Sequence, residues 1–194
     1  MSDFNTLYAA LKAQLSVLDT HNTLMVGIHT GGYWLAQQLH AELGFKQALA
    51  ALSTTLQRDD FATSGLHQQR QPTRLPLSLQ GMQVLLVDDV LHTGRTIRAA
   101  LNELYEYGRP ASVQLAVLVD RGGRELPFEA QFCGGKLSVP TGHEWVLSQS
   151  LQGLSLQALS LQSLSLQTLS LQSQGKPPIK TSASATTSAT GKAA

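Results

Sequence analysis

The sequence predicts an α/β domain in which a central, mostly parallel sheet is flanked by helices. Two short apolar runs, at residues 24–29 and 84–87, indicate strands that are buried on both faces, as in a parallel sheet. Each run leads through a glycine-containing turn into a stretch whose apolar residues recur at helical spacing. A chain of 194 residues is long enough for one such domain with a sizeable core.

The first half of the chain predicts a helix, a strand, a second helix and a second strand. The first helix covers residues 4–18, where apolar side chains lie on one face, and the strand at 24–29 follows it. The second helix covers residues 33–43, and a strand with β-branched threonines covers 50–57. Residues 62–81 keep neither period, which is typical of a long loop that is either functional or disordered.

The second half of the chain predicts one more helix between strands. The apolar run at 84–87 precedes a helix that is expected to end at Tyr107, before a glycine. An apolar strand is predicted over residues 112–119 and a short one over 128–132. A last strand over residues 144–147 would close the fold.

The C-terminal part changes character, so the folded domain is expected to cover residues 1–149. Residues 150–174 repeat an uncharged unit of five residues, as in SLQGL and SLQAL. A period of five matches neither a helix nor a strand, and so few short units cannot bury a continuous core as a solenoid. The repeat is interpreted as a low-complexity extension able to self-associate, and residues 175–194 as a disordered tail.

Composition limits the classes of protein to which the chain can belong. No apolar run is long enough to span a membrane, and the N-terminus does not resemble a secretory signal. Cys133 is the single cysteine, so an internal disulfide is impossible and a cytoplasmic location is expected. Before Ser148 there are 11 basic and 13 acidic residues, a net charge near −2 that does not favour nucleic-acid binding.

The stretch VLLVDDVLHTGRT, residues 84–96, carries the chemistry. Ligands of open α/β sheets bind beyond the carboxyl ends of the strands, where Asp88 and Asp89 are expected. The turn that follows offers backbone N–H groups and the threonine hydroxyls at a helix N-terminus, which suits a phosphate. The acids suit ribose hydroxyls or magnesium instead. The pattern therefore predicts a sugar phosphate across the strand end; an ordinary strand, acidic turn and helix is the alternative.

A second glycine turn, Thr30-Gly31-Gly32, follows the strand at 24–29 in the same way. Its N–H groups could bind diphosphate, whereas the alternative is a plain turn that needs glycine for conformational freedom. Arg58 follows another predicted strand and can reach a phosphate or remain a solvated charge.

The stretch at residues 84–96 resembles the phosphoribosyl pyrophosphate (PRPP) signature of type I phosphoribosyltransferases. Residues 108–127 (GRPASVQLAVLVDRGGRELP), 24–39 (LMVGIHTGGYWLAQQL) and 56–61 (LQRDDF) are similar to the pyrimidine operon regulator/uracil phosphoribosyltransferase family, PyrR. The resemblance covers residues 24–147. It implies the type I phosphoribosyltransferase fold with a small hood, and a salvage reaction in which uracil and PRPP give UMP and diphosphate.

The resemblance also implies a role for each group of site residues. Asp88 and Asp89 would be the catalytic acids, bound to ribose hydroxyls and, directly or through water, to Mg²⁺. Many members have arginine at the position of Gly31, although others have Thr-Gly-Gly. The glycine removes a positive charge that would attract diphosphate, which weakens the case for tight PRPP binding and for activity. Arg124 and Glu125 are interpreted as a surface ion pair. The other expected contacts are Leu91, His92, Thr93, Gly94, Arg95 and Thr96 to the 5′-phosphate, Thr30, Gly31, Gly32 and Arg58 to diphosphate, Arg70 and Arg74 on a lid, and Arg121 and Val139 at the base.

Two other functions stay open at this stage. The family name implies an RNA-binding attenuator of pyrimidine genes that senses UMP or PRPP, although the first fifty residues contain only Lys12 and Lys46 as basic residues. A purine phosphoribosyltransferase, or a relative without catalysis, is the other alternative. The family also implies a homodimer or a larger homo-oligomer, with PRPP, uracil and UMP as ligands.

Overall fold

A computed structural model describes residues 4–54 and 72–160 of the chain. The chain divides into two compact units, and all described residues except Ser160 belong to the first, Met1–Leu159. In the described residues no helix is both long and apolar enough to cross a membrane.

The chain has a central parallel sheet, as the sequence predicts, and five strands form it. They are β1 (Thr23–Ile28), β2 (Ala50–Leu52), β3 (Gln83–Leu91), β4 (Ser112–Asp120) and β5 (Phe132–Lys136). Their order in the sheet is β2-β1-β3-β4-β5, and every neighbouring pair is parallel. Since β3 lies between β1 and β4, the carboxyl end of β3 is at the centre of the edge where ligands of such sheets bind.

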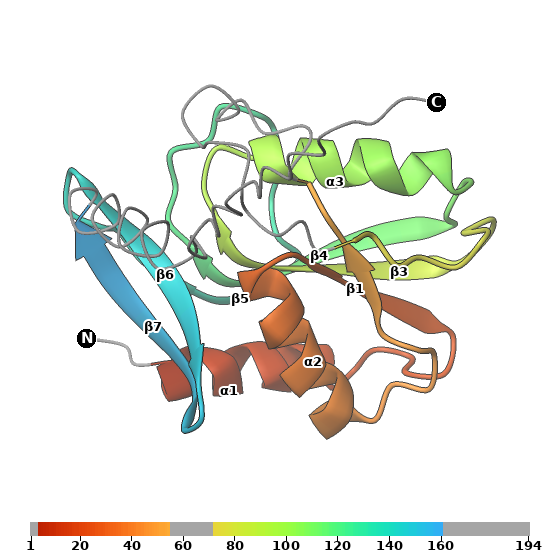
Figure 1. Ribbon diagram of the computed structural model, residues 1–194, viewed down its shortest axis with the longest axis horizontal. Helices are drawn as coiled ribbons and strands as arrows, with labels where there is room; N and C mark the ends of the chain where they lie inside the picture. The colour runs from red at the N-terminus through yellow and green to blue at the C-terminus, as the bar shows by residue number, and fades with distance from the viewer. Residues whose placement is uncertain (1–3, 55–71, 161–194) are drawn as a thin grey trace, which may run out of the picture. The chain divides into compact units, whose positions relative to one another are not determined.

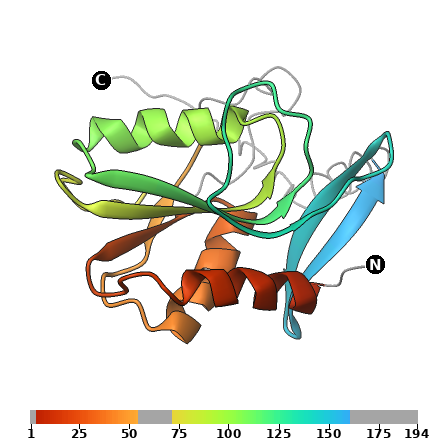
Figure 2. The ribbon, with the colours of Figure 1, turned by 180° about the vertical axis from the view of Figure 1, so that it is seen from behind.

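Helices cover both faces of this sheet (Figures 1 and 2). The helices α1 (Phe4–Leu15) and α2 (Gly31–Leu43) pack on one face, and α3 (Arg95–Glu106) packs on the other. The middle strand serves both layers, because Leu85 belongs to the core under α1 and α2 while Leu86 belongs to the core under α3. Burial on both faces explains why the strands read as continuous apolar runs.

Two strand predictions differ from the structure. The strand expected at 84–87 continues through both acids to Leu91, because its pairing with β4 extends to Leu91↔Asp120. The strand expected over 128–132 is wrong: the fifth strand is β5, which begins at Phe132. The sequence does not predict β5 as a strand because it contains two glycines, Gly134 and Gly135. Close packing explains why glycine occupies these positions. A side chain at Gly134 would meet the backbone oxygens of Leu7 and Leu118, each at 2.6 Å.

The last predicted strand does not close the central sheet. It is β6 (His143–Ser150), which pairs with β7 (Gly153–Ser160) in a separate two-stranded sheet. Only two residues join these strands, so they run antiparallel.

The strand β7 consists of residues that the sequence assigns to the low-complexity extension. Leu154 and Leu156 are two residues apart, so they share one face of the strand, and both pack against the core under α1. The spacing L-x-L within each repeat therefore suits a short strand even though the full period does not. The boundary expected after residue 149 differs from the end of the compact unit at Leu159. Residues 161–194 lie outside the described part.

Two leucines of the repeat test this packing. Leu156→Ala should lower the free energy of unfolding by about 1–2 kcal/mol, because it removes partly buried apolar surface. Leu151→Ala should change it by less than about 0.5 kcal/mol, because Leu151 is 108% exposed. Urea denaturation monitored by circular dichroism measures both values. Equal effects of the two substitutions would show that β7 does not contribute to the folded unit.

Candidate active site

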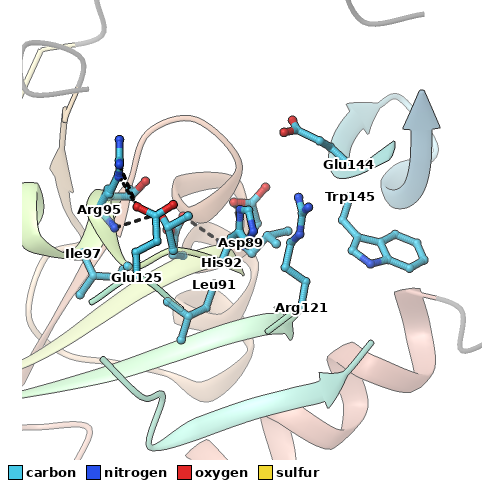
Figure 3. Close-up of a pocket in the computed structure, with 14 residues that line it drawn as sticks. Asp89, Leu91, His92, Arg95, Ile97, Arg121, Glu125, Glu144 and Trp145 are labelled. Atoms are coloured by element: carbon cyan, nitrogen blue, oxygen red, sulfur yellow. Dashed lines mark hydrogen bonds and ion pairs between the residues drawn. The ribbon is translucent and has the colours of Figure 1, made fainter. Parts of the chain in front are cut away.

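A polar pocket of about 480 Å³ lies at the carboxyl end of β3 (Figure 3). It is lined by residues 88–97, by Arg121 and Glu125 after β4, and by Glu144 and Trp145 of β6. The two acids and the loop that follows them, which the sequence expects to act together, therefore border one cavity. The lining also includes Glu144 and Trp145 of the second sheet, which the sequence analysis does not expect at the site.

Asp88 and Asp89 are held in the last part of β3. Asp88 is only 6% exposed and is paired in register with Val117 of β4. Its Oδ1 accepts the N–H of Asp89 at 3.0 Å, and Oδ1 of Asp89 accepts the N–H of Val90 at 3.1 Å. Because each acid occupies a strand position, the pairing of β3 fixes the backbone of these two residues at the wall of the pocket.

The turn Thr30-Gly31-Gly32 packs directly against this pair of acids. A side chain at Gly31 would collide with the carboxylate of Asp89, and one at Gly32 would lie 2.7 Å from Cα of Asp88. Glycine at both positions is thus required for close approach of the α2 N-terminus to β3. The His29–Thr30 peptide is cis, and Thr30 makes no side-chain cap to α2. Gly31 and Gly32 thus lie against the acids, but Thr30, Gly31 and Gly32 are not among the residues that line the pocket.

The turn after β4, residues 120–126, holds the loop after β3 by its carbonyl groups. The N–H of Arg121 donates to O of Leu91 at 3.0 Å, and Nη1 of Arg124 donates to O of His92 at 2.7 Å. The N–H groups of Glu125 and Leu126 both donate to the next carbonyl, of Thr93, at 3.0 Å. Three consecutive carbonyls are therefore turned toward the β4 turn.

This arrangement decides where the N–H groups of the loop point. In a planar trans peptide the C=O and the following N–H point in opposite directions. Fixing the carbonyls of His92 and Thr93 on the β4 turn therefore directs the N–H groups of Thr93 and Gly94 away from it. Gly94 has φ 91°, a conformation that favours glycine, and α3 begins at the next residue. Free N–H groups beside a helix N-terminus form a site for an anion.

The ion pairs of the β4 turn differ from the predicted Arg124–Glu125 pair. Arg124 binds Asp120 at 2.7 Å, with side chains 23% and 15% exposed. Glu125 instead binds Arg95, at the end of the loop after β3, at 2.8 Å in an exposed pair. Arg124 also donates Nε to O of Phe128 at 2.9 Å, so one guanidinium holds three segments together. In the sequence, Asp120 and Arg124 are four residues apart and flank two glycines, a pattern that could have indicated an ion pair across a turn.

The pKa values of Asp120 and His92 are both lowered, for different physical reasons. Burial raises the pKa of Asp120, but the N–H of Gly122 and the guanidinium of Arg124 outweigh burial and lower it. Burial lowers the pKa of His92, and Arg121 lowers it further. The His92 ring lies against the β4 turn, since a side chain at Gly123 would be 2.8 Å from its Nε2.

Of the remaining residues expected at the site, Arg74 and Val139 do not line the pocket. Arg58 and Arg70 lie outside the described residues. Arg74 is exposed, and its backbone pairs with Ala51 of β2 through N–O distances of 2.7 and 3.0 Å. Burial and then the charge of Arg74 lower the pKa of His29, which places Arg74 near the Thr30 turn. Val139 lies between β5 and β6 and does not line the pocket.

Comparison with known proteins gives a consistent result. Residues 5–147 match the family described as phosphoribosyl transferase domain. The chain is 44% identical over 152 residues to the Bifunctional protein PyrR of Ralstonia nicotianae, covering 78% of this chain and 87% of that protein. It is 50% identical over 129 residues to the protein of the same name from Pseudomonas aeruginosa, covering 66% and 76%.

Solved structures share the fold at low sequence identity. A Trypanosoma cruzi hypoxanthine phosphoribosyl transferase superposes with a TM-score of 0.59 at 14% identity, covering 88% of this chain and 94% of that one. A Staphylococcus aureus hypoxanthine phosphoribosyltransferase gives a TM-score of 0.53 at 19% identity, covering 69% and 74%.

The role of Arg124 can be tested without a ligand. Arg124→Lys keeps the charge but cannot bind three segments at once, so the loop should open more often. We expect amide hydrogen exchange over residues 91–96 to become at least about 10-fold faster, as measured by mass spectrometry. Arg98→Lys, an exposed substitution on α3, is the matched control. We call the hydrogen bonds by which the β4 turn holds the loop after β3 the clamp. Unchanged amide exchange in Arg124→Lys would contradict the role of Arg124 in this clamp.

The Asp120–Arg124 pair should also give a defined pH dependence. Asp120→Asn is expected to lower the free energy of unfolding at pH 7 by about 1–2 kcal/mol. Since the folded state lowers the pKa of Asp120, its stabilisation is complete above the unfolded pKa of about 3.9 and is lost as the pH falls through the folded pKa. The difference between wild type and variant should therefore shrink below about pH 4. Denaturation at several pH values measures it, with Glu106→Gln as control; a constant difference would refute the pairing.

Proposed function

The chain belongs to the PyrR family of phosphoribosyl transferase domain proteins, and on this basis we propose that it converts uracil and PRPP to UMP and diphosphate. The observation that carries the proposal is a pocket lined by Asp88, Asp89 and the loop after β3, in which the N–H groups of Thr93 and Gly94 point away from the β4 turn. A phosphorylated pentose presents hydroxyls and a phosphate at a separation that can bridge these two groups.

The 5′-phosphate would bind the loop after β3. The N–H groups of Thr93 and Gly94 point away from the β4 turn and can donate to phosphate oxygens, as can the hydroxyls of Thr93 and Thr96. Arg95 brings positive charge, balanced in the free protein by Glu125. Because the β4 turn already holds the carbonyls, the donors are oriented before the ligand arrives, which lowers the entropic cost of binding.

Asp88 and Asp89 would hold the ribose hydroxyls. Displacement of diphosphate at the anomeric carbon develops positive charge on the ribose ring, and two carboxylates at the strand end stabilise that charge. The base nitrogen forms the new C–N bond and releases its proton to water, while the electron pair of the broken C–O bond leaves with diphosphate. The turn Thr30–Gly32, with Arg58, Arg70 and Arg74, is the proposed diphosphate side.

The donor set fits magnesium. Carboxylate oxygens are the ligands that Mg²⁺ prefers, and in phosphate-transferring sites it commonly uses one or two protein carboxylates with substrate oxygens and water. In the described residues no three metal-binding side chains come together, so Asp88 and Asp89 would be the protein's share. When bound, the ion would neutralise charge on the leaving diphosphate.

A purine base is the second candidate, because the solved structures with the same fold include hypoxanthine phosphoribosyltransferases. Their likeness concerns the fold alone, since identity is 19% or lower. The base must therefore be decided by measurement.

An assay with purified protein, PRPP, Mg²⁺ and one base at a time decides the reaction. Uracil should give UMP, and hypoxanthine, guanine and adenine should give little nucleotide. Asp89→Asn should lower kcat about 100-fold or more, because a neutral amide stabilises the developing charge poorly. Glu129→Gln, an exposed change outside the pocket, should leave kcat unchanged. Absence of UMP would refute the proposal, and exclusive use of a purine would support the second candidate.

A further inference from the structure

Two oppositely charged side chains in the pocket are not used by the protein itself. Arg121 and Glu144 both line it, and in the described part of the chain neither side chain has a hydrogen bond or an ion-pair partner. Arg95 by contrast binds Glu125. Arg121 is partly exposed and its guanidinium has no protein acceptor, so its N–H groups are left to water or to a ligand. A guanidinium at a pocket wall in this state is available to a ligand that supplies an acceptor.

These two side chains reach the pocket from different sheets. Arg121 follows the last residue of β4 and lies beside the loop after β3, because its N–H binds O of Leu91. Glu144 lies near the start of β6, where the next residue, Trp145, packs against the core under α1. Figure 3 shows the guanidinium of Arg121 and the carboxylate of Glu144 extending toward the same space from these two elements.

The pairing of charges indicates what the ligand group is. An arginine alone would suit a phosphate, but Glu144 beside it would repel an anion. Together a donor and an acceptor fit a neutral group that presents an acceptor and a donor next to each other. In the proposed reaction the ribose hydroxyls and the nucleobase are neutral. The hydroxyls are assigned to Asp88 and Asp89, so this end of the pocket is matched to the base.

We infer that Arg121 and Glu144 read the –NH–C(=O)– edge of the base and thereby select oxo bases over amino bases. This inference rests on the proposed phosphoribosyl transfer. The ring N–H of uracil donates to the carboxylate of Glu144, and the adjacent carbonyl accepts from Arg121. Cytosine presents an amino group and a bare ring nitrogen instead. The amino group of cytosine would then face the donor Arg121, and its bare ring nitrogen would face the acceptor Glu144. Neither side chain would gain a hydrogen bond, so cytosine would bind poorly.

The substitution Glu144→Ala tests the inference through separate Michaelis constants. KM for uracil should rise about 10-fold or more, because a charge-assisted hydrogen bond is lost, while KM for PRPP should change less than about 2-fold. Glu144→Gln carries both a donor and an acceptor, so it should narrow the preference for uracil over cytosine by about 10-fold. Glu129→Gln is the matched control. An unchanged KM for uracil together with unchanged selectivity would overturn the inference.

Binding measured by calorimetry separates the inference from the reaction. Wild-type protein should bind uracil more tightly than cytosine when PRPP is present, and Glu144→Ala should lose that preference. If wild-type protein forms no UMP but shows this Glu144-dependent preference, the proposed function fails and the inference stands. If wild-type protein forms UMP while Glu144→Ala retains the full preference, the inference alone fails.

Discussion

The site depends on the hydrogen bonds by which the turn after β4 holds the loop after β3. Three successive carbonyls, of Leu91, His92 and Thr93, accept N–H groups or the guanidinium of Arg124. Because the C=O and the following N–H of a planar trans peptide point in opposite directions, the N–H groups of Thr93 and Gly94 point away from the β4 turn. The loop therefore presents donors to an anion without a dedicated lysine or a long glycine-rich motif.

The parallel sheet makes this clamp possible. Because β3 and β4 are neighbours that run in the same direction, both chains leave the sheet at the same edge and their turns meet there. The partly buried pair of Asp120 and Arg124 then fixes the shape of the second turn. The same edge receives the α2 N-terminus, which approaches Asp89 closely only because Gly31 has no side chain. The order of the strands thus brings together the two acids, the loop after β3 and the glycine turn before α2.

The sequence predicts those parts of the fold and site that depend on local pattern. Buried parallel strands, the helices and the juxtaposition of Asp88 and Asp89 with the loop follow from periodicity and from the chemistry of a strand end. What could not be predicted depends on contacts between distant segments. Arg124 binds a carbonyl 32 residues earlier, and Glu144 reaches the pocket from a second sheet. The two glycines of β5 and the leucines of β7 have meaning only once α1 is packed beside them.

The central claim is that the clamp directs the amides of Thr93 and Gly94 into the pocket, where they bind phosphate. Titration of ¹⁵N-labelled protein with ribose 5-phosphate, followed by amide chemical shifts, tests it most directly. The account predicts that Thr93 and Gly94 shift most and saturate together, and that ribose without phosphate leaves them unmoved. Saturable binding of ribose 5-phosphate with both of these amides unperturbed would contradict it.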